Sequence, residues 1–117
     1  MNKLFAGAAF VLCCAISLTA TAGGNIANGK AVTAKYACAS CHGADFNSPT
    51  DPTYPKLAGQ HADYLEHALI AYKRGGDGPN GRVQAIMNGM AKPLSHQEMT
   101  DVAAYLNSLP GSLVQPK

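Results

Sequence analysis

The sequence contains no tryptophan and few charged residues, which make up 14% of its 117 residues. Nine lysines and arginines against seven aspartates and glutamates leave a formal net charge of only +2. A protein that binds nucleic acid through its surface charge needs a far larger excess of positive charge. We therefore expect no nucleic-acid partner.

The chain also lacks the alternation of apolar and polar residues that is typical of β-strands, and it contains no internal repeat. Its length of 117 residues is too short for two ordinary domains but sufficient for one modest hydrophobic core. Apolar residues recur at helical spacing in several segments. The sequence therefore predicts a single all-α domain.

The first 22 residues differ from the rest of the chain. A lone cation, Lys3, precedes an apolar run over residues 4–18, and small residues follow at positions 20–22. This is the pattern of a secretory signal peptide cleaved near Ala22/Gly23. The apolar run is shorter than the roughly 20 residues of a spanning helix, so we expect no stable membrane insertion after cleavage. The predicted organisation is a signal peptide at 1–22 and one domain at 23–117.

Cysteine is scarce once the predicted leader is set aside, because Cys13 and Cys14 lie within it and only Cys38 and Cys41 remain. Two cysteines build neither a disulfide framework nor a four-cysteine zinc site. A thioredoxin-like redox pair would lie beside a βαβ pattern, which the sequence lacks. A plain disulfide would leave the adjacent His42 without a role.

Together, Cys38, Cys41 and His42 form the pattern Cys-x-x-Cys-His, which is typical of covalent haem attachment. Two sulfurs three residues apart on a helix can form thioethers with the two vinyl groups of a porphyrin. The histidine that follows can bind the iron. This interpretation uses all three residues, and the export signal agrees with it independently.

Three helices are predicted along the mature chain. Asn25 can cap a first helix over about residues 26–39. The stretch "QHADYLEHALIAYKRGG" has helical apolar spacing and ends at Gly75. Ser95 and Glu98 form a capping box for a last helix over about residues 96–109.

Two intervening segments are expected to be loops. The first, residues 43–59, contains three prolines, and the second, residues 77–93, is rich in glycine. A short helical turn at residues 83–87 is compatible with the second loop.

A second axial ligand of the iron decides between an electron carrier and an open binding or catalytic site. The candidate side chains are those of methionine and histidine, namely Met87, Met90, Met99, His61, His67 and His96. We expect Met99 in the core and the three histidines on the surface. In the expected loop, Met87 and Met90 can each present a thioether, with a gap-filling core methionine as the alternative.

The segments "CASCHGAD", "YPKLAGQHADYLEHAL" and "MNGMAKPLSHQEMTDVAAYLNSL" resemble class I cytochromes c. The chain is similar in particular to the small periplasmic single-haem cytochromes and to one half of their tandem two-haem relatives. The resemblance covers nearly the whole mature chain. It implies a fold of about three to five helices wrapped around one covalently attached haem c, in the periplasm.

The same resemblance implies roles for individual residues. The family spacing to the serine that opens the last helix makes Met87 the axial ligand, with Met90 as the runner-up. The carbonyl of Pro55 accepts the Nδ1 hydrogen of His42, and Leu57 packs on the haem face. The resemblance also implies that Gly29 and Tyr105 belong to the contact between the first and last helices.

The function implied is electron transfer, not enzymatic catalysis. One electron is carried on a haem with His/Met ligation between periplasmic or membrane partners such as an oxidase, reductase or dehydrogenase. The alternative hypotheses are a haem enzyme subunit or gas-binding sensor with an open axial position, and a thiol oxidoreductase without haem.

Overall fold

The structure, a computed structural model, describes residues 23–113, and these residues form five helices and no strand. The helices are α1 (Ile26–Lys35), α2 (Ala39–His42), α3 (Ala62–Arg74), α4 (Ala85–Ala91) and α5 (His96–Ser108). The all-α prediction is confirmed. The predicted signal peptide and its cleavage site lie outside the described residues. Within residues 23–113, no helix is long and apolar enough to cross a membrane.

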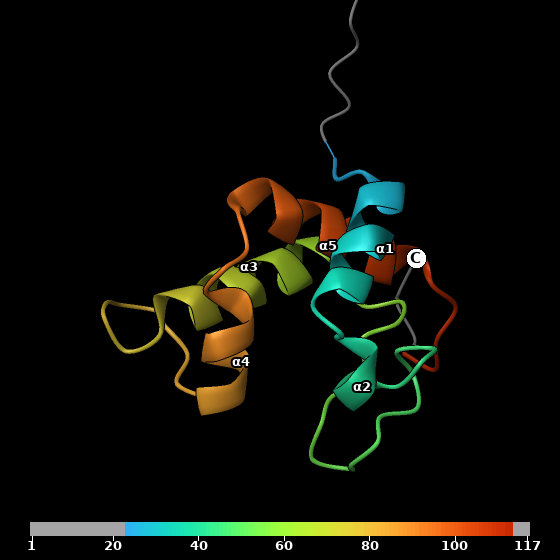
Figure 1. Ribbon diagram of the computed structural model, residues 1–117, viewed down its shortest axis with the longest axis horizontal. Helices are drawn as coiled ribbons and strands as arrows, with labels where there is room; N and C mark the ends of the chain where they lie inside the picture. Colours follow the sequence, from blue (N-terminus) through green and yellow to red (C-terminus); the bar gives the residue numbers. More distant parts are fainter. Residues whose placement is uncertain (1–22, 114–117) are drawn as a thin grey trace, which may run out of the picture.

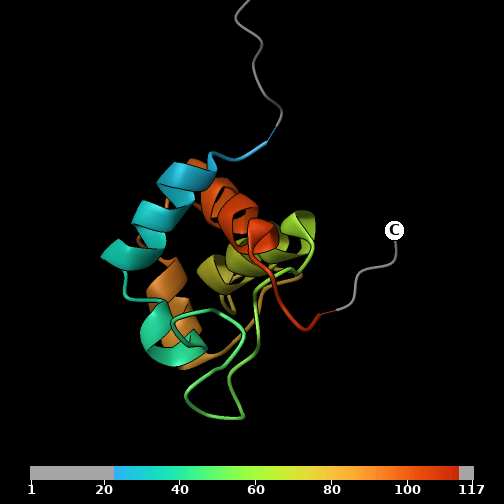
Figure 2. The same ribbon diagram turned by 90° about the vertical axis from the view of Figure 1, so that its right-hand side faces the viewer.

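Helix α5 is the centre of the helix packing. It packs against both α1 and α3, and α3 in turn packs against α4. Figure 1 shows α2 and α4 on two sides of the lower half of the molecule, and Figure 2 shows α1 lying alongside α5. The core is formed by a cluster of buried side chains that includes Val32, Phe46, Leu65, Leu94, Met99, Val102 and Leu106. The prediction that Met99 belongs to the core is confirmed.

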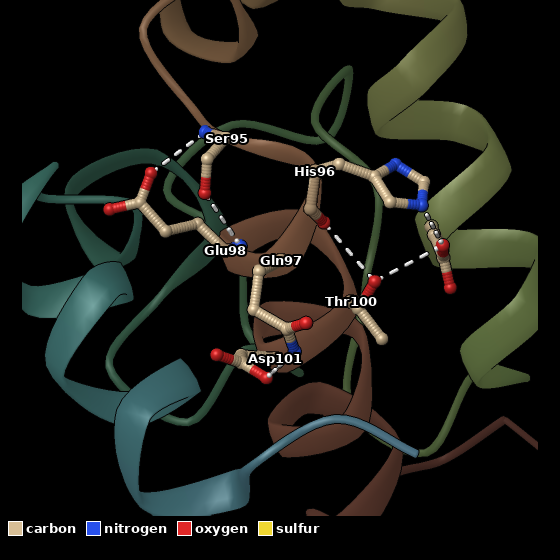
Figure 3. A network of polar contacts seen from close by, with 7 residues as sticks. Ser95, His96, Gln97, Glu98, Thr100 and Asp101 are labelled. Carbon is tan, nitrogen blue, oxygen red and sulfur yellow. Dashed lines mark hydrogen bonds and ion pairs between the residues drawn. The ribbon is translucent and has the colours of Figure 1, made fainter. Parts of the chain in front are cut away.

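The start of α5 has the cap that the sequence predicts. Ser95 Oγ accepts a hydrogen bond from the backbone N–H of Glu98 at 3.1 Å, and Glu98 Oε2 accepts one from the backbone N–H of Ser95 at 2.8 Å (Figure 3). Leu94 and Met99, on either side of the cap, are both buried. The exposed imidazole of His96 lies 3.4 Å from Glu66 Oε1. This end of α5 is therefore fixed by its own sequence.

The contact between α1 and α5 brings one backbone directly against another. A Cβ atom on Gly29 would lie 2.0 Å from the carbonyl oxygen of Asp101 and 2.8 Å from Cβ of Tyr105. Only glycine permits this approach. The Tyr105 ring is nearly perpendicular to the ring of Phe46, with 6.1 Å between the two centroids. The helix contact implied for Gly29 and Tyr105 is therefore present.

The buried carboxylate of Asp101 joins the start of α1 to α5. Its Oδ1 accepts from the backbone N–H of Asn25 at 2.7 Å and from Gln97 Nε2 at 2.9 Å, and its Oδ2 accepts from Asn28 Nδ2 at 2.6 Å. Figure 3 shows Gln97 reaching this carboxylate. Burial alone would raise the pKa of Asp101, but these three hydrogen bonds hold it below its usual value.

One predicted helix boundary and one predicted loop are wrong. The first helix ends at Lys35 instead of continuing to residue 39, because Ala37 adopts a left-handed conformation with φ of 50°. The segment expected to be a loop around Met87 and Met90 is instead the seven-residue helix α4. Gln84 caps this helix by accepting a hydrogen bond from the backbone N–H of Met87 at 2.7 Å. Glutamine is not a preferred N-cap residue, so the sequence carried little signal for this start.

Replacing Gly29 by alanine should destabilise the protein. The new methyl group would force α1 away from α5, and overpacking of this kind costs about 1–3 kcal/mol of unfolding free energy. Denaturant unfolding measures the change. The matched control is Gly89→Ala on α4, where a Cβ atom would meet nothing within 4 Å. That control should gain about 0.5–1 kcal/mol from helix propensity. Equal effects of the two substitutions would contradict the close contact.

Replacing Asp101 by asparagine should lower stability at neutral pH by about 1–3 kcal/mol, because one buried donor loses its acceptor. The pKa of Asp101 is lower in the folded protein, so its stabilisation is present above about pH 3.9, the unfolded value. It is lost as the pH falls through the folded value. Urea unfolding of both proteins at neutral and acidic pH should show the difference shrinking in acid. Asp77→Asn, on the exposed loop after α3, is the control. A difference that grows in acid would contradict this role.

Candidate functional site

A cavity of about 670 Å³ lies among α2, α3 and α4 and is lined mainly by apolar surface. Its volume is within the range of about 300–1,000 Å³ that is typical of small-molecule and cofactor sites. Its wall contains the side chains of Cys38, Cys41, His42, Met87 and Met90. Figure 1 shows the two short helices that carry most of these residues, α2 and α4, on two sides of the molecule.

The short helix α2 and its N-cap residue, Cys38, form the Cys-x-x-Cys-His segment. The left-handed turn at Ala37 ends α1, and the backbone N–H of Cys38 then donates to the carbonyl of Thr33 at 3.0 Å. Within α2, the N–H of His42 donates to the carbonyl of Cys38 at 3.1 Å. Gly43, with φ of 88°, ends the helix directly after the histidine. The two cysteines and the buried histidine are thereby presented to one cavity.

The His42 ring is oriented by the loop that follows it. Its Nδ1 lies 2.9 Å from the carbonyl oxygen of Pro55. A carbonyl oxygen only accepts hydrogen bonds, so Nδ1 carries the hydrogen in this contact. The other ring nitrogen of the neutral imidazole, Nε2, is then free of a hydrogen and able to bind a metal.

Backbone hydrogen bonds hold this loop in place. The carbonyl of the buried Phe46 accepts from the N–H of Leu57 at 2.8 Å and of Ala58 at 2.9 Å. The N–H of Thr50 donates to the carbonyl of Cys41 at 3.0 Å, which ties the loop back to α2. Leu57 is half-buried and lines the cavity beside Pro55. The proline-containing segment is thus a loop, as predicted, but a firmly positioned one.

Two of the candidate methionines and histidines line the cavity. Met87 and Met90 both line the cavity, because residues three apart share one face of α4. Met99 lies in the core instead. His61, His67 and His96 are exposed, as predicted, and none of them is in the cavity wall. The geometry brings both remaining methionines to the site and does not choose between them.

The Cys38 thiol does not have the lowered pKa of a redox-active cysteine. Burial raises the pKa of the Cys38 thiol, and the nearby Cys41 adds to the rise. Thiol oxidoreductases instead need a lowered pKa that favours the thiolate. Both thiols are free in the described part of the chain. In residues 23–113, no three histidine, cysteine, aspartate or glutamate side chains form a group that could hold a metal ion.

The cavity wall also contains Arg82, Tyr64 and Tyr72, to which no motif of the sequence assigns a role. The guanidinium carbon of Arg82 lies 5.5 Å from the ring centre of each tyrosine. One signal was available, because Arg82 is the only charged residue between Asp77 and Lys92. In the sequence, the two tyrosines belong to the apolar spacing that predicts α3.

An all-helical shell whose cavity wall contains a Cys-x-x-Cys-His segment is the arrangement of c-type cytochromes. Residues 26–110 match the cytochrome c family, and the chain belongs to this family. Membership implies covalently bound haem c, and the cavity fits this group. The cavity wall contains two thiols that can bind the porphyrin and an imidazole that can bind iron. It also contains methionine thioethers as further possible iron ligands, and the lining is mainly apolar.

Known relatives agree with this assignment. Cytochrome c4 of Stutzerimonas stutzeri is 39% identical, over 97% of this chain and 53% of that protein. The crystal structure of reduced recombinant cytochrome c4 from Pseudomonas stutzeri superposes with a TM-score of 0.68 at 40% identity, over 77% of this chain and 48% of that chain. A thiosulfate dehydrogenase electron acceptor of Stutzerimonas stutzeri (strain A1501) is 39% identical, over 70% of this chain and 36% of that protein. The chain spans about half the length of the cytochrome c4 relatives it matches.

Proposed function

We propose that this protein is a periplasmic electron carrier with one covalently bound haem c and His42 and Met87 as its axial ligands. The observation that carries the proposal is the composition of a single cavity wall. It contains both cysteines, the imidazole and the candidate thioethers within about 670 Å³. The predicted signal peptide supports export to the periplasm.

Each residue of the site has a defined task in this proposal. The thiols of Cys38 and Cys41 anchor the porphyrin through thioethers. The carbonyl of Pro55, 2.9 Å from Nδ1, fixes the ring of His42 and makes Nε2 a better donor to iron. Leu57 packs on the face of the porphyrin. Met87 is the ligand from α4 because it precedes Ser95 by the spacing typical of the family.

The bound haem supplies a one-electron couple between ferric and ferrous iron. The chain sets the balance of that couple. A neutral, soft thioether and an apolar wall both disfavour the additional positive charge of the ferric state. They therefore raise the reduction potential. Nothing in this arrangement transforms a substrate, so we propose a carrier and not an enzyme.

The partners we propose are redox proteins that dock briefly. One relative's name is that of an electron acceptor of thiosulfate dehydrogenase, although this chain covers 36% of that protein. By extension, we infer that a dehydrogenase, reductase or oxidase gives electrons to this protein or takes them from it. Small, transient interfaces are typical of such encounters.

Covalent attachment is tested by extracting the mature protein with acidified acetone. Haem should stay with the wild-type chain, because two thioether bonds hold it. The double variant C38A/C41A should release its haem completely under the same treatment. Ser40→Ala, between the two cysteines on α2, is the control and should retain haem. A colourless wild-type protein after extraction would reject the proposal in favour of a haem-free function.

The axial ligand is tested with the volume-conserving variants Met87→Leu and Met90→Leu. The ferric protein should show a near-infrared band from methionine bound to iron. Met87→Leu should abolish this band, whereas Met90→Leu should keep it. The opposite result would assign the ligand to Met90. Rapid binding of carbon monoxide to the reduced wild-type protein would indicate an open iron and contradict the carrier function.

A further inference from the structure

Little apolar packing holds α4, the helix that carries the two candidate methionine ligands. Of its seven residues only Ala91 is buried, and Ile86 is 51% exposed. Gly89, within the helix, lowers its helix propensity further. The main packing partner of α4 is α3, which lies above it in Figure 1. A helix this short does not persist by itself in water, so its position depends on contacts with the rest of the protein.

The side-chain amide of Asn88 on α4 supplies the polar part of these contacts. Its Nδ2 donates to the backbone carbonyls of Tyr72 and Arg82, each at 2.7 Å. Its Oδ1 accepts from the backbone N–H of Gln84 at 2.8 Å. The Tyr72 carbonyl is one of the last four of α3, which lack a partner within that helix. One half-buried side chain therefore joins the end of α3, the connecting loop and the start of α4.

Asn88 also completes the cap around Met87. The side chain of Gln84 accepts from the backbone N–H of Met87 at 2.7 Å, and the backbone N–H of Gln84 donates in return to the Asn88 side chain. This reciprocal pair is similar to a capping box, with the returning side chain one residue later than usual. The first turn of α4, which includes Met87, is thus fixed from both of its ends.

The Asn88 side chain is directed away from the cofactor cavity. Met87 and Met90 line that cavity, whereas Asn88 lines a separate, polar hollow beside the end of α3. Any effect of Asn88 on a bound haem must therefore pass through the position of α4.

We propose that Asn88 is a positioning residue that keeps the methionine ligand of α4 on the haem iron. The inference rests on the proposed function, because it requires an iron bound by a methionine of this helix. It applies to Met87 and to Met90 alike, since α4 carries both.

The physical reason is the cost of moving α4 away from α3. In the observed position, the Asn88 amide satisfies two carbonyls and one N–H of the backbone. A departing α4 would break these three hydrogen bonds, so they favour the state in which the methionine stays bound. Without the amide, that preference is smaller, and a larger fraction of the ferric protein has its methionine off the iron.

The test compares Asn88→Ala with the matched control Asn28→Ala in the haem-loaded protein. Asn28 lies on α1, where its side-chain amide donates to Asp101 Oδ2 at 2.6 Å, and it is not part of the cavity wall. Both substitutions remove an asparagine amide that links two helices, so both lower general stability. Only one of them acts on α4.

Imidazole added to the ferric protein is the probe. It binds the iron after the methionine has left, so its apparent affinity follows the methionine-free fraction. Loss of the near-infrared band reports the exchange. Asn88→Ala should bind imidazole about tenfold more tightly than the wild type, as expected for the loss of about 1.4 kcal/mol of hydrogen bonding. The Asn28→Ala affinity should stay close to that of the wild type.

Hydrogen exchange, measured by mass spectrometry, reports the motion of α4 directly. Asn88→Ala should accelerate amide exchange in residues 85–91 and leave that of α5 unchanged, because local opening depends on local contacts. If Asn88→Ala does not accumulate with haem, Asn88→Asp replaces it. Aspartate keeps the acceptor for the Gln84 N–H but loses both donated hydrogen bonds. Its imidazole affinity should rise as well.

The outcomes separate this inference from the proposed function. Faster exchange in α4 with an unchanged imidazole affinity would assign Asn88 a purely structural role and overturn the inference. An equal rise in affinity for Asn28→Ala would attribute the effect to general stability, with the same consequence. In both cases a wild-type protein that keeps its haem in acidified acetone and shows the near-infrared band leaves the proposed function intact. Absence of that band from the wild type would instead reject the proposed methionine ligation.

Discussion

The close contact of α1 with α5 is the constraint on which the rest of the structure depends. Gly29 places the backbone of α1 directly against Asp101, and the Asp101 carboxylate binds the start of the same helix. One end of this pair leads through Ala37 into α2, and α5 also packs against α3, which carries α4. Both walls of the cavity are thus positioned from α5. The main helix contacts do not include one between α2 and α4, so a cofactor bound to both would join the two walls.

This arrangement suits a domain with few large core residues. The chain has no tryptophan, and alanines are among the buried residues of its core cluster. A small core of this kind gives limited stability, which covalent or cofactor links commonly supplement. Haem in the cavity would add a large apolar surface in contact with Leu57, Leu65 and Leu106, which all line it. The proposed cofactor would then complete the core as well as carry the electron.

The sequence predicted the parts of the fold that depend on local signals. The capping box at Ser95, the glycine stop after α3 and the buried position of Met99 each follow from residues close in the chain. The left-handed Ala37 could not be foreseen, because alanine has no preference for that conformation. Helix α4 was missed because its cap is a glutamine side chain and it contains Gly89. The contact of Arg82 with Tyr64 and Tyr72 could not be foreseen, because it joins a loop residue to two side chains of α3.

The helical structure of α4 affects how the site would carry electrons. A methionine in a free glycine-rich loop can leave the iron when the charge changes, and each departure and return slows transfer. Here Gln84 caps the first turn of α4 at Met87, and Asn88 joins α4 to the carbonyls of Tyr72 and Arg82. On the opposite wall, Pro55 holds the ring of His42. Both proposed ligands are therefore restrained by groups outside the metal centre. This restraint favours an iron that keeps the same ligands in both oxidation states, which a carrier needs and an open catalytic site does not.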